Sequence, residues 1–170
     1  MDPPHAPAVL PAGNGANFAL GGELGARTTA CVEHFDKPLP LSSPRLTEMI
    51  RDRNHGPQPL LPWSGEFVGK YLTHCCGLYR LTNDEALLSM MQSVIAALQL
   101  YQAEDGYIGC WPDDKQFAVG NWDSWGHYHV LYGLCLYYEL TAEASVMATC
   151  KKIADKLVSA FPTAQAEQST

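Results

Sequence analysis

The sequence predicts an all-α protein built from two tandem helical hairpins. The main observation is an internal repeat, because residues 63–98 align without gaps with residues 122–157 at a constant offset of 59. Apolar residues recur with helical spacing in both copies, and a polar corner divides each copy into two segments. Self-similarity at a fixed period is typical of architectures in which one structural unit is stacked on another.

The two copies share a common order of residues. Each begins with tryptophan, passes through an aromatic and apolar stretch to Tyr-x-Leu-Thr, and resumes with helical periodicity after the polar corner. The identical positions pair Trp63 with Trp122, Leu72 with Leu131, Cys76 with Cys135, Tyr79 with Tyr138, Leu81 with Leu140, Thr82 with Thr141, and Leu98 with Leu157. We therefore expect the same structural unit twice.

Composition and charge restrict the class of protein. The 170 residues can form one domain with a sizeable core, and 46% hydrophobic content is typical of a soluble globular protein. The net charge of -7 and the lack of a basic stripe argue against nucleic acid or anionic lipid as a general partner. No apolar run could span a bilayer, and the start lacks the pattern of a signal peptide. A cytoplasmic location is expected by default, with no membrane partner.

The chain is predicted to begin with a flexible segment over residues 1–41, where Pro, Gly and Ala break any regular period. A helical domain is expected over residues 42–161, followed by a disordered tail over residues 162–170. The first helix of the domain covers residues 43–53. Its N-cap and first helical position are Ser43 and Pro44, and its apolar face comprises Leu46, Met49 and Ile50.

Each copy of the repeat predicts an enclosed helix followed by a more exposed one. In the first copy, residues 66–80 carry apolar and aromatic side chains around much of the helix, and a second helix runs from Asp84 to Tyr101. The acidic start at Asp84 suits the helix dipole. In the second copy, residues 125–140 are apolar on nearly all sides, whereas residues 144–160 are amphipathic. The first helices should form an inner layer and the second helices an outer layer.

Parallel inner helices would bring unusual residues to one edge of the molecule. Their N-terminal ends would lie there together with the connection from the second helix to the third. The residues of this edge are Trp63, Glu66, Lys70, Asp105, Tyr107, Trp111, Trp122, Trp125, His127 and His129. Aromatic faces bind the apolar faces of sugars, and convergent polar groups fix their orientation. The edge therefore predicts a carbohydrate site, with Trp111 and Trp125, which are not repeated, as the better platforms.

Two alternatives apply to the polar residues of this edge. His127 and His129 could ligate zinc with Cys110, but side chains two residues apart on a helix diverge by about 200°. Hydrogen-bonded structural histidines are the favoured explanation, and no metal site is predicted. Glu66 and Asp105 could form the carboxylate pair of a glycosidase. Glu66 also suits a helix N-terminus, and Asp105 followed by glycine suits a turn.

The cysteines are predicted to be reduced thiols, because a disulfide framework is expected only in short secreted chains. A free cysteine in an apolar helical pattern behaves as a small hydrophobe. The cysteines in such patterns are Cys76, Cys135 and Cys150.

Three motifs together resemble glycoside hydrolase family 127, the β-L-arabinofuranosidase-like proteins formerly called domain of unknown function 1680. They are Pro62-Trp63-x-Gly65-Glu66-Phe67-x-Gly69-Lys70-Tyr71-Leu72, Asp105-Gly106-Tyr107-Ile108-Gly109 and His129-x-x-Tyr132-Gly133-Leu134. The resemblance covers about residues 41–160 and implies that the two hairpins form part of an (α/α)6 toroid. It also implies that His129 and Tyr132 lie in the sugar pocket. Lys70 departs from the Gly-His-Tyr-Leu stretch of many relatives.

The resemblance also predicts what this chain lacks. Characterised relatives use a cysteine nucleophile beside a zinc ion bound by cysteines and a glutamate, with a separate glutamate as acid/base, and nothing here matches that signature. Cys75 and Cys76 are adjacent and point about 100° apart on a helix. The repeat explains Cys76 as the counterpart of Cys135, so both are expected to be structural.

We therefore expect the N-terminal portion of a glycoside hydrolase that contributes sugar-contacting residues, without a nucleophile, a zinc site or another cofactor of its own. The expected partner is an arabinose-containing glycan, and further candidates are the remainder of the toroid or a second copy of the chain. The alternative is a non-catalytic helical-repeat module that binds a protein. The polar character of the predicted edge favours carbohydrate.

Overall fold

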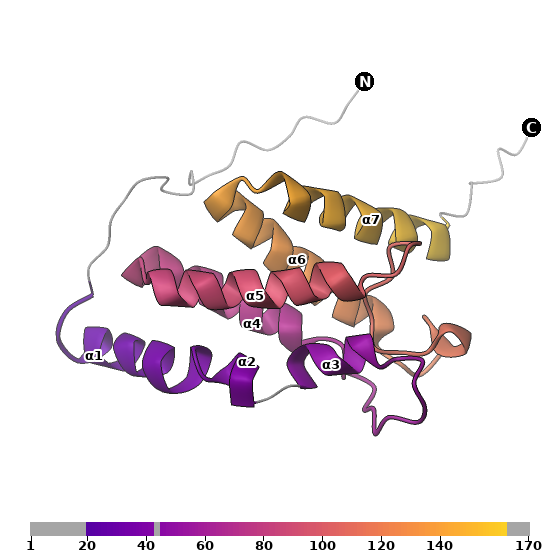
Figure 1. Ribbon diagram of the computed structural model, residues 1–170, viewed down its shortest axis with the longest axis horizontal. Coiled ribbons are helices and arrows are strands. Elements are labelled where there is room, and N and C mark those ends of the chain that lie inside the picture. Colours follow the sequence, from indigo (N-terminus) through magenta and orange to yellow (C-terminus); the bar gives the residue numbers. More distant parts are fainter. Residues whose placement is uncertain (1–19, 43–44, 163–170) are drawn as a thin grey trace, which may run out of the picture.

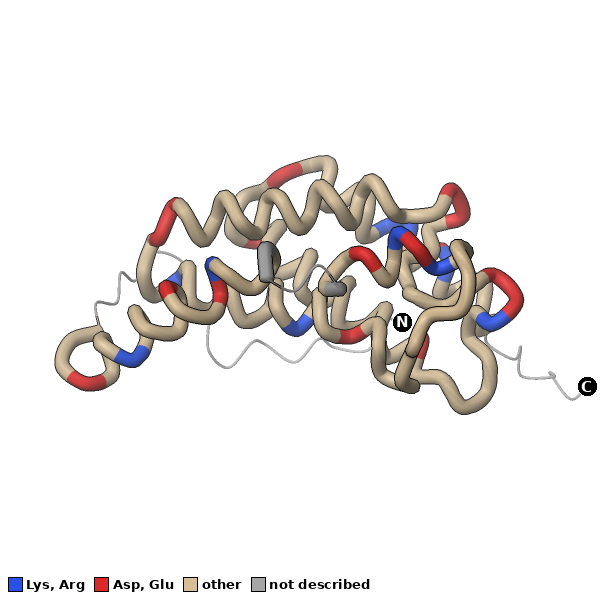
Figure 2. Tube along the Cα trace, turned by 60° about the horizontal axis from the view of Figure 1, so that its bottom comes forward, with Lys and Arg blue, Asp and Glu red and all other residues tan. Residues whose placement is uncertain are grey.

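The computed structural model describes residues 20–42 and 45–162. Within these ranges the chain is helical and contains no strand, which confirms the all-α prediction. Figure 1 shows two helical hairpins, with α5 lying against α4 and α7 lying beside α6. No helix in these ranges is long and apolar enough to cross a bilayer. Figure 2 shows Lys and Arg interspersed with Asp and Glu along the chain, without a basic stripe.

The inner helices are α4 (Phe67–Thr82) and α6 (Asp123–Thr141), and they run side by side in the same direction. Side chains at equivalent positions of the repeat meet across them. Arg80 Nη2 lies 3.0 Å from Glu139 Oε2, and the two residues are 59 positions apart in the sequence. The second hairpin is therefore the first hairpin displaced sideways, with the repeat in register.

Glycines allow α4 and α6 to approach until their backbones touch. A Cβ atom on Gly69 would lie 2.2 Å from the carbonyl carbon of His129, and one on Gly133 would lie 2.8 Å from the carbonyl oxygen of Gly69. Contacts this short leave room for glycine alone, which is a common reason for glycine where two backbones meet. The close approach fixes the position of His129 relative to the start of α4.

The outer helices, α5 (Glu85–Tyr101) and α7 (Ala144–Ala160), follow tight corners of the same design. Asn83 and Ala142, which are equivalent in the repeat, both adopt the left-handed conformation, with φ of 51° and 55°. Asp84 caps α5 by accepting a hydrogen bond from the Leu87 N–H at 2.9 Å. Both outer helices begin and end where the sequence predicts them.

The N-terminal part of the described chain differs from the sequence prediction. Residues 22–41, expected to belong to a flexible segment, are largely helical. They form α1 (Gly22–Cys31), a π-helical turn η1 (Val32–Asp36) and the start of α2 (Leu39–Ser42). Most prolines of the segment lie in residues 1–19, outside the described ranges, and residues 23–35 contain no proline. Burial of Val32 in the core stabilises a helix that composition alone does not predict.

Several polar contacts attach this segment to the first hairpin, among them the following two. The Tyr71 hydroxyl donates to the backbone carbonyl of Asp36 at 3.0 Å, and Lys37 Nζ lies 2.8 Å from Asp84 Oδ2. The next helix, α3 (Arg45–Arg51), lies within the predicted range of residues 43–53. Its predicted apolar face packs in the core, whereas its predicted cap, Ser43 and Pro44, lies outside the described residues.

The core lies between the inner and outer layers. Its centre consists of fully buried aliphatic side chains, including Leu72, Leu87, Leu98, Leu134 and Ile153. The six cysteines are free thiols, and those at positions 75, 76, 110 and 150 are buried. Burial raises the pKa of both the Cys75 and the Cys76 thiol to about 12. These thiols pack as small apolar groups and are not reactive thiolates near neutral pH.

Candidate functional site

The N-terminal ends of α4 and α6 lie at one end of the hairpins, together with the loops that precede them (Figure 1). Glu66, the residue before α4, is only 6% exposed. One of its carboxylate oxygens lies 2.7 Å from Lys70 Nζ, and the other accepts a hydrogen bond from the Trp125 indole N–H. Glu66 and Trp125 are equivalent positions of the repeat, so the in-register packing of the two hairpins creates this contact.

His129 lies one turn after Trp125 on α6, and its ring packs edge-on against the Trp125 ring with centroids 4.6 Å apart. Its Nε2 atom is buried and has no hydrogen-bond partner among the described residues. A buried polar atom left unpaired costs about 1–3 kcal/mol, so Nε2 would gain a hydrogen bond from a ligand that reaches it. We call Glu66, Lys70, Trp125 and His129 the Glu66 cluster.

The charges of the Glu66 cluster are set by burial and by its own members. Burial opposes ionisation of Glu66, but the hydrogen bonds from Lys70 and Trp125 outweigh it and hold the pKa of Glu66 below its ordinary value. Burial and the Lys70 charge lower the pKa of His129, against the opposing effect of Glu66. Near neutral pH the cluster therefore presents a carboxylate, an ammonium group and a neutral imidazole.

An aromatic stripe continues from this cluster along the exposed face of α6. Trp125, Tyr128 and Tyr132 have neighbouring rings stacked with centroids 5.5 and 6.0 Å apart, and each is nearly half exposed. The sequence analysis predicts Trp125 and Tyr132 as site residues but not Tyr128. Its spacing of three and four residues from the other two places it on the same helical face, and this signal could have identified it.

Tyr107 and His127, which the sequence analysis also places among sugar-contacting residues, lie in a separate buried network. The Tyr107 hydroxyl donates to Asp123 Oδ2 at 2.9 Å, and His127 Nδ1 lies 2.9 Å from the Asp123 carbonyl oxygen. The Ile108 N–H donates to His127 Nε2 at 3.2 Å. Both side chains are fully buried, so neither offers surface to a ligand in this structure. We call Tyr107, Asp123 and His127 the Asp123 network.

Three further predicted residues make contacts within the protein: Asp105 is held in an ion pair, and Trp63 and Trp122 pack against each other. Asp105 forms an ion pair with Lys156 on α7 and accepts the Tyr107 N–H at 3.1 Å. Among the described residues Asp105 makes no contact with Glu66, so the two do not meet as a carboxylate pair. Trp63 and Trp122 pack against each other with ring centroids 5.8 Å apart. That contact supports the repeated packing role predicted for the two tryptophans.

Comparison with models of protein families shows to which family the chain belongs. Residues 27–170 match the family model described as β-L-arabinofuranosidase, GH127 catalytic domain. The chain belongs to glycoside hydrolase family 127. The match includes all three motifs on which the resemblance rests. A search of curated protein sequences found no match.

Solved structures of family 127 share the fold. A β-L-arabinofuranosidase from Geobacillus stearothermophilus T6 aligns over 88% of this chain with a TM-score of 0.69 and 19% sequence identity. A second family 127 β-arabinofuranosidase aligns over 86% of the chain, with a TM-score of 0.62 and 18% identity. The alignments cover 27% and 26% of those chains, so this chain spans about a quarter of their length. The two hairpins therefore correspond to part of the helical toroid of these family 127 structures.

The zinc alternative considered for Cys110, His127 and His129 does not fit the structure. No group of three or more His, Cys, Asp or Glu side chains within the described ranges could hold a metal ion. Burial also raises the pKa of the Cys110 thiol to about 12, and His127 is engaged on both ring nitrogens. No chemical step is therefore assigned to a metal held by these residues.

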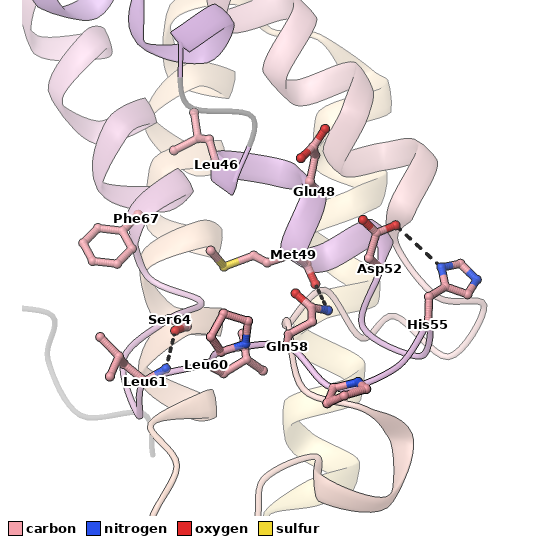
Figure 3. Close-up of a pocket in the computed structure, with 12 residues that line it drawn as sticks. Leu46, Glu48, Met49, Asp52, His55, Gln58, Leu60, Leu61, Ser64 and Phe67 are labelled. Carbon is pink, nitrogen blue, oxygen red and sulfur yellow. Dashed lines mark hydrogen bonds and ion pairs between the residues drawn. The ribbon is translucent and has the colours of Figure 1, made fainter.

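A separate hollow of about 850 Å³ lies between α3, the following loop and the start of α4 (Figure 3). Asp52 Oδ1 and His55 Nδ1 lie 3.6 Å apart at its rim. The Leu61 N–H donates to Ser64 Oγ at 2.7 Å and fixes the turn before α4. None of the predicted sugar-contacting residues lines this hollow. The Glu66 cluster is therefore the better match to the sequence prediction.

Proposed function

We propose that this chain forms the N-terminal portion of a family 127 catalytic domain and supplies sugar-contacting residues for an arabinofuranoside-type glycan. The family match supports the class of domain, and the Glu66 cluster supports the sugar contacts. A carboxylate, an ammonium group and an unpaired imidazole nitrogen converge beside an exposed indole ring. This combination of polar groups and an aromatic face is what a sugar ring requires.

Each member of the cluster has a distinct role in this proposal. Trp125 provides an apolar face against which the C–H groups of a sugar ring can pack. Lys70, whose side chain is 46% exposed, can donate to a ring or hydroxyl oxygen while it remains paired with Glu66. His129 Nε2 supplies the unpaired contact for a further hydroxyl. Tyr132 and Tyr128 extend the aromatic surface toward a neighbouring sugar.

Glu66 acts in this proposal as a hydrogen-bond acceptor and positioning residue, not as the acid of the reaction. A glycosidase acid must carry a proton at the working pH, and its pKa is therefore usually raised. The pKa of Glu66 is lowered instead. We assign the nucleophile and the acid/base to the part of the domain that this chain does not include. No observation supports the alternative of a protein-binding module.

The observation that carries the proposal is the buried, unpaired His129 Nε2 beside Glu66, Lys70 and Trp125. Isothermal titration with methyl β-L-arabinofuranoside tests it. The His129→Ala variant should bind about tenfold more weakly, because one buried hydrogen bond is worth about 1 kcal/mol or slightly more. A matched control is His55→Ala, whose side chain is 74% exposed and lies outside the cluster. Equal affinity for the His129→Ala variant and the unaltered chain would remove His129 from the site.

A second measurement addresses catalysis. The purified chain should release no arabinose from a β-L-arabinofuranoside, because burial raises the pKa of the Cys75 and Cys76 thiols and the lowered pKa of Glu66 leaves it without a proton to donate near neutral pH. Turnover that persists in the His129→Ala variant would show contamination by another enzyme. Turnover that depends on Glu66 would overturn the assignment of catalysis to the rest of the domain.

A further inference from the structure

A second hollow, of about 160 Å³, lies between the loops that precede α4 and α6. Hydrogen bonds hold these loops together: Asn54 Nδ2 donates to Asp113 Oδ1 at 3.1 Å, the Asp113 N–H donates to Asn54 Oδ1 at 3.2 Å, and the Trp122 N–H donates to the Pro62 carbonyl at 2.9 Å. Arg53 lines one side, and Trp111 and Lys115 line the other. The hollow is on the same end of the hairpins as the Glu66 cluster but shares no residue with it.

The polar groups that distinguish this hollow are donors. The Trp111 Nε1–H group is buried and has no hydrogen-bond partner among the described residues. An indole N–H, a guanidinium and an ammonium group can donate hydrogen bonds but accept none. No Asp or Glu is among the residues that line the hollow, although the chain as a whole carries a net charge of -7. This local set of donors calls for an anionic acceptor.

Arg53 is held in place by backbone and ring contacts, with the Asp105 carboxylate near enough to interact with its charge. Its Nη1 atom donates to the backbone carbonyls of Ile50 and Tyr101 at 3.1 and 3.0 Å, and its guanidinium lies 5.5 Å from the centre of the Tyr107 ring. None of the ion pairs among the described residues includes Arg53. A fixed guanidinium with free N–H groups matches the planar geometry of a carboxylate and loses little entropy on binding.

The surroundings restrict the charge of the ligand. An adjoining outer hollow shares Arg53 and Lys115 but is also bordered by Asp113 and Asp114. Asp113 is held by Asn54 and Gln116, so it remains close to the entrance. Two carboxylates at the entrance repel a divalent anion more strongly than a monovalent one. These carboxylates oppose the attraction of Arg53 and Lys115 for any anion, and the planar guanidinium fits the shape of a single carboxylate.

We propose that the hollow between Arg53, Trp111 and Lys115 binds the carboxylate of a sugar acid such as a uronate. The preference for a carboxylate is argued from the residues that line the hollow. That the ligand is a sugar rests on the function proposed for the Glu66 cluster. The family 127 domain would then accept a glycan that carries an acidic residue near its arabinofuranoside.

The Trp111 indole N–H provides a direct readout. In a ¹H–¹⁵N correlation spectrum of the whole chain, its signal is assigned by its loss in the Trp111→Phe variant. Titration with D-glucuronate should shift this signal with saturation, and D-glucose should not shift it. Lys115→Gln should weaken D-glucuronate binding about three- to fivefold, the effect of one partly exposed charge. Lys151→Gln, which removes an exposed charge on α7 that does not line the hollow, should leave the affinity unchanged.

Several results would overturn the proposal: no shift of the Trp111 signal, an equal shift with D-glucose, or tighter binding of inorganic phosphate than of D-glucuronate. Lys115→Glu gives a second variant at an exposed position, and undiminished binding there would also contradict the proposal. Failure of the Glu66 cluster is distinguishable, because His129→Ala should weaken binding of the arabinofuranoside about tenfold while the D-glucuronate response of Trp111 persists.

Discussion

His127 and His129 are two residues apart on the same helix, yet they belong to regions with opposite properties. In the Asp123 network, His127 is fully buried and both ring nitrogens are engaged. In the Glu66 cluster, His129 is partly exposed and its Nε2 atom has no partner among the described residues. The Asp123 network holds the loop before α6 in place, whereas the Glu66 cluster keeps a hydrogen-bonding atom without a partner in the described part of the chain. His127, whose ring nitrogens are both hydrogen-bonded, is therefore the structural histidine. His129, whose Nε2 has no partner within the described ranges, is the candidate for ligand binding.

Among the variants that test this comparison, Asp123→Ala should change the free energy of unfolding most. It removes the acceptor shared by Tyr107 Oη and the Phe117 N–H. Loss of buried partners on several sides should lower the free energy of unfolding by about 3 kcal/mol. Urea denaturation followed by circular dichroism measures the change. The control is Asp114→Ala, whose carboxylate is exposed and should matter by less than about 0.5 kcal/mol. Equal effects of the two variants would show that the network is not structural.

A smaller but related effect is expected at Gly69, where α4 touches the backbone of His129. Gly69→Ala should destabilise the fold by about 1–3 kcal/mol, because the added methyl group has to displace backbone atoms. Gly77→Ala is a matched control on the same helix, with no atom within 4 Å of the added Cβ. It should stabilise the chain by about 0.5–1 kcal/mol. A stabilising effect of both substitutions, measured by thermal unfolding, would contradict the close contact.

The pH dependence of stability should separate the ionised cluster from the rest of the chain. The pKa of Glu66 lies below its ordinary value of 4.5 in the folded state, so the unfolded chain binds a proton more readily there. The stabilisation by Glu66 is present above pH 4.5 and should be lost as the pH falls through the lower, folded value. Glu66→Gln should flatten this part of the stability profile between pH 5 and 3, relative to the unaltered chain. An identical profile for Glu66→Gln would show that Lys70 and Trp125 do not hold the carboxylate.

The smallest effect is expected on the aromatic stripe. Tyr128→Ser should change the free energy of unfolding by less than about 0.5 kcal/mol, because the ring is half exposed and opposite the core. Tyr137→Ser, a substitution of the same kind at a fully buried position of the same helix, should cost several times more. Comparable losses of unfolding free energy in the two variants, measured by urea denaturation, would mean that the aromatic stripe stabilises the fold of this isolated chain.

Much of the fold could be predicted from the sequence, because the repeat shows the pattern of each inner and each outer helix twice. The outer helices match the predicted bounds, and the inner helices start or end only a few residues away from them. The helices before Arg45 could not be predicted in the same way. They have no counterpart in the repeat, and the contacts that attach the segment to the hairpin, including burial of Val32 and the Tyr71–Asp36 hydrogen bond, are tertiary.

The candidate site was predictable only in part. The repeat offset brings Glu66 to Trp125, and helical spacing adds Lys70 and His129, so these four residues could be grouped from the sequence. The burial of Tyr107 and His127 depends on how the loop before α6 folds back, which periodicity does not describe. Asp123, the residue that joins them, gave no signal beyond its place at a helix start.

The most direct test of the central claim is chemical-shift mapping of the whole chain with methyl β-L-arabinofuranoside. We expect saturable shifts of the Trp125 indole N–H and the His129 imidazole signals, while the signals of Tyr107 and His127 remain in place. Shifts of the His127 signals without those of His129, or no shift at all at saturating sugar, would contradict the assignment of sugar binding to the Glu66 cluster.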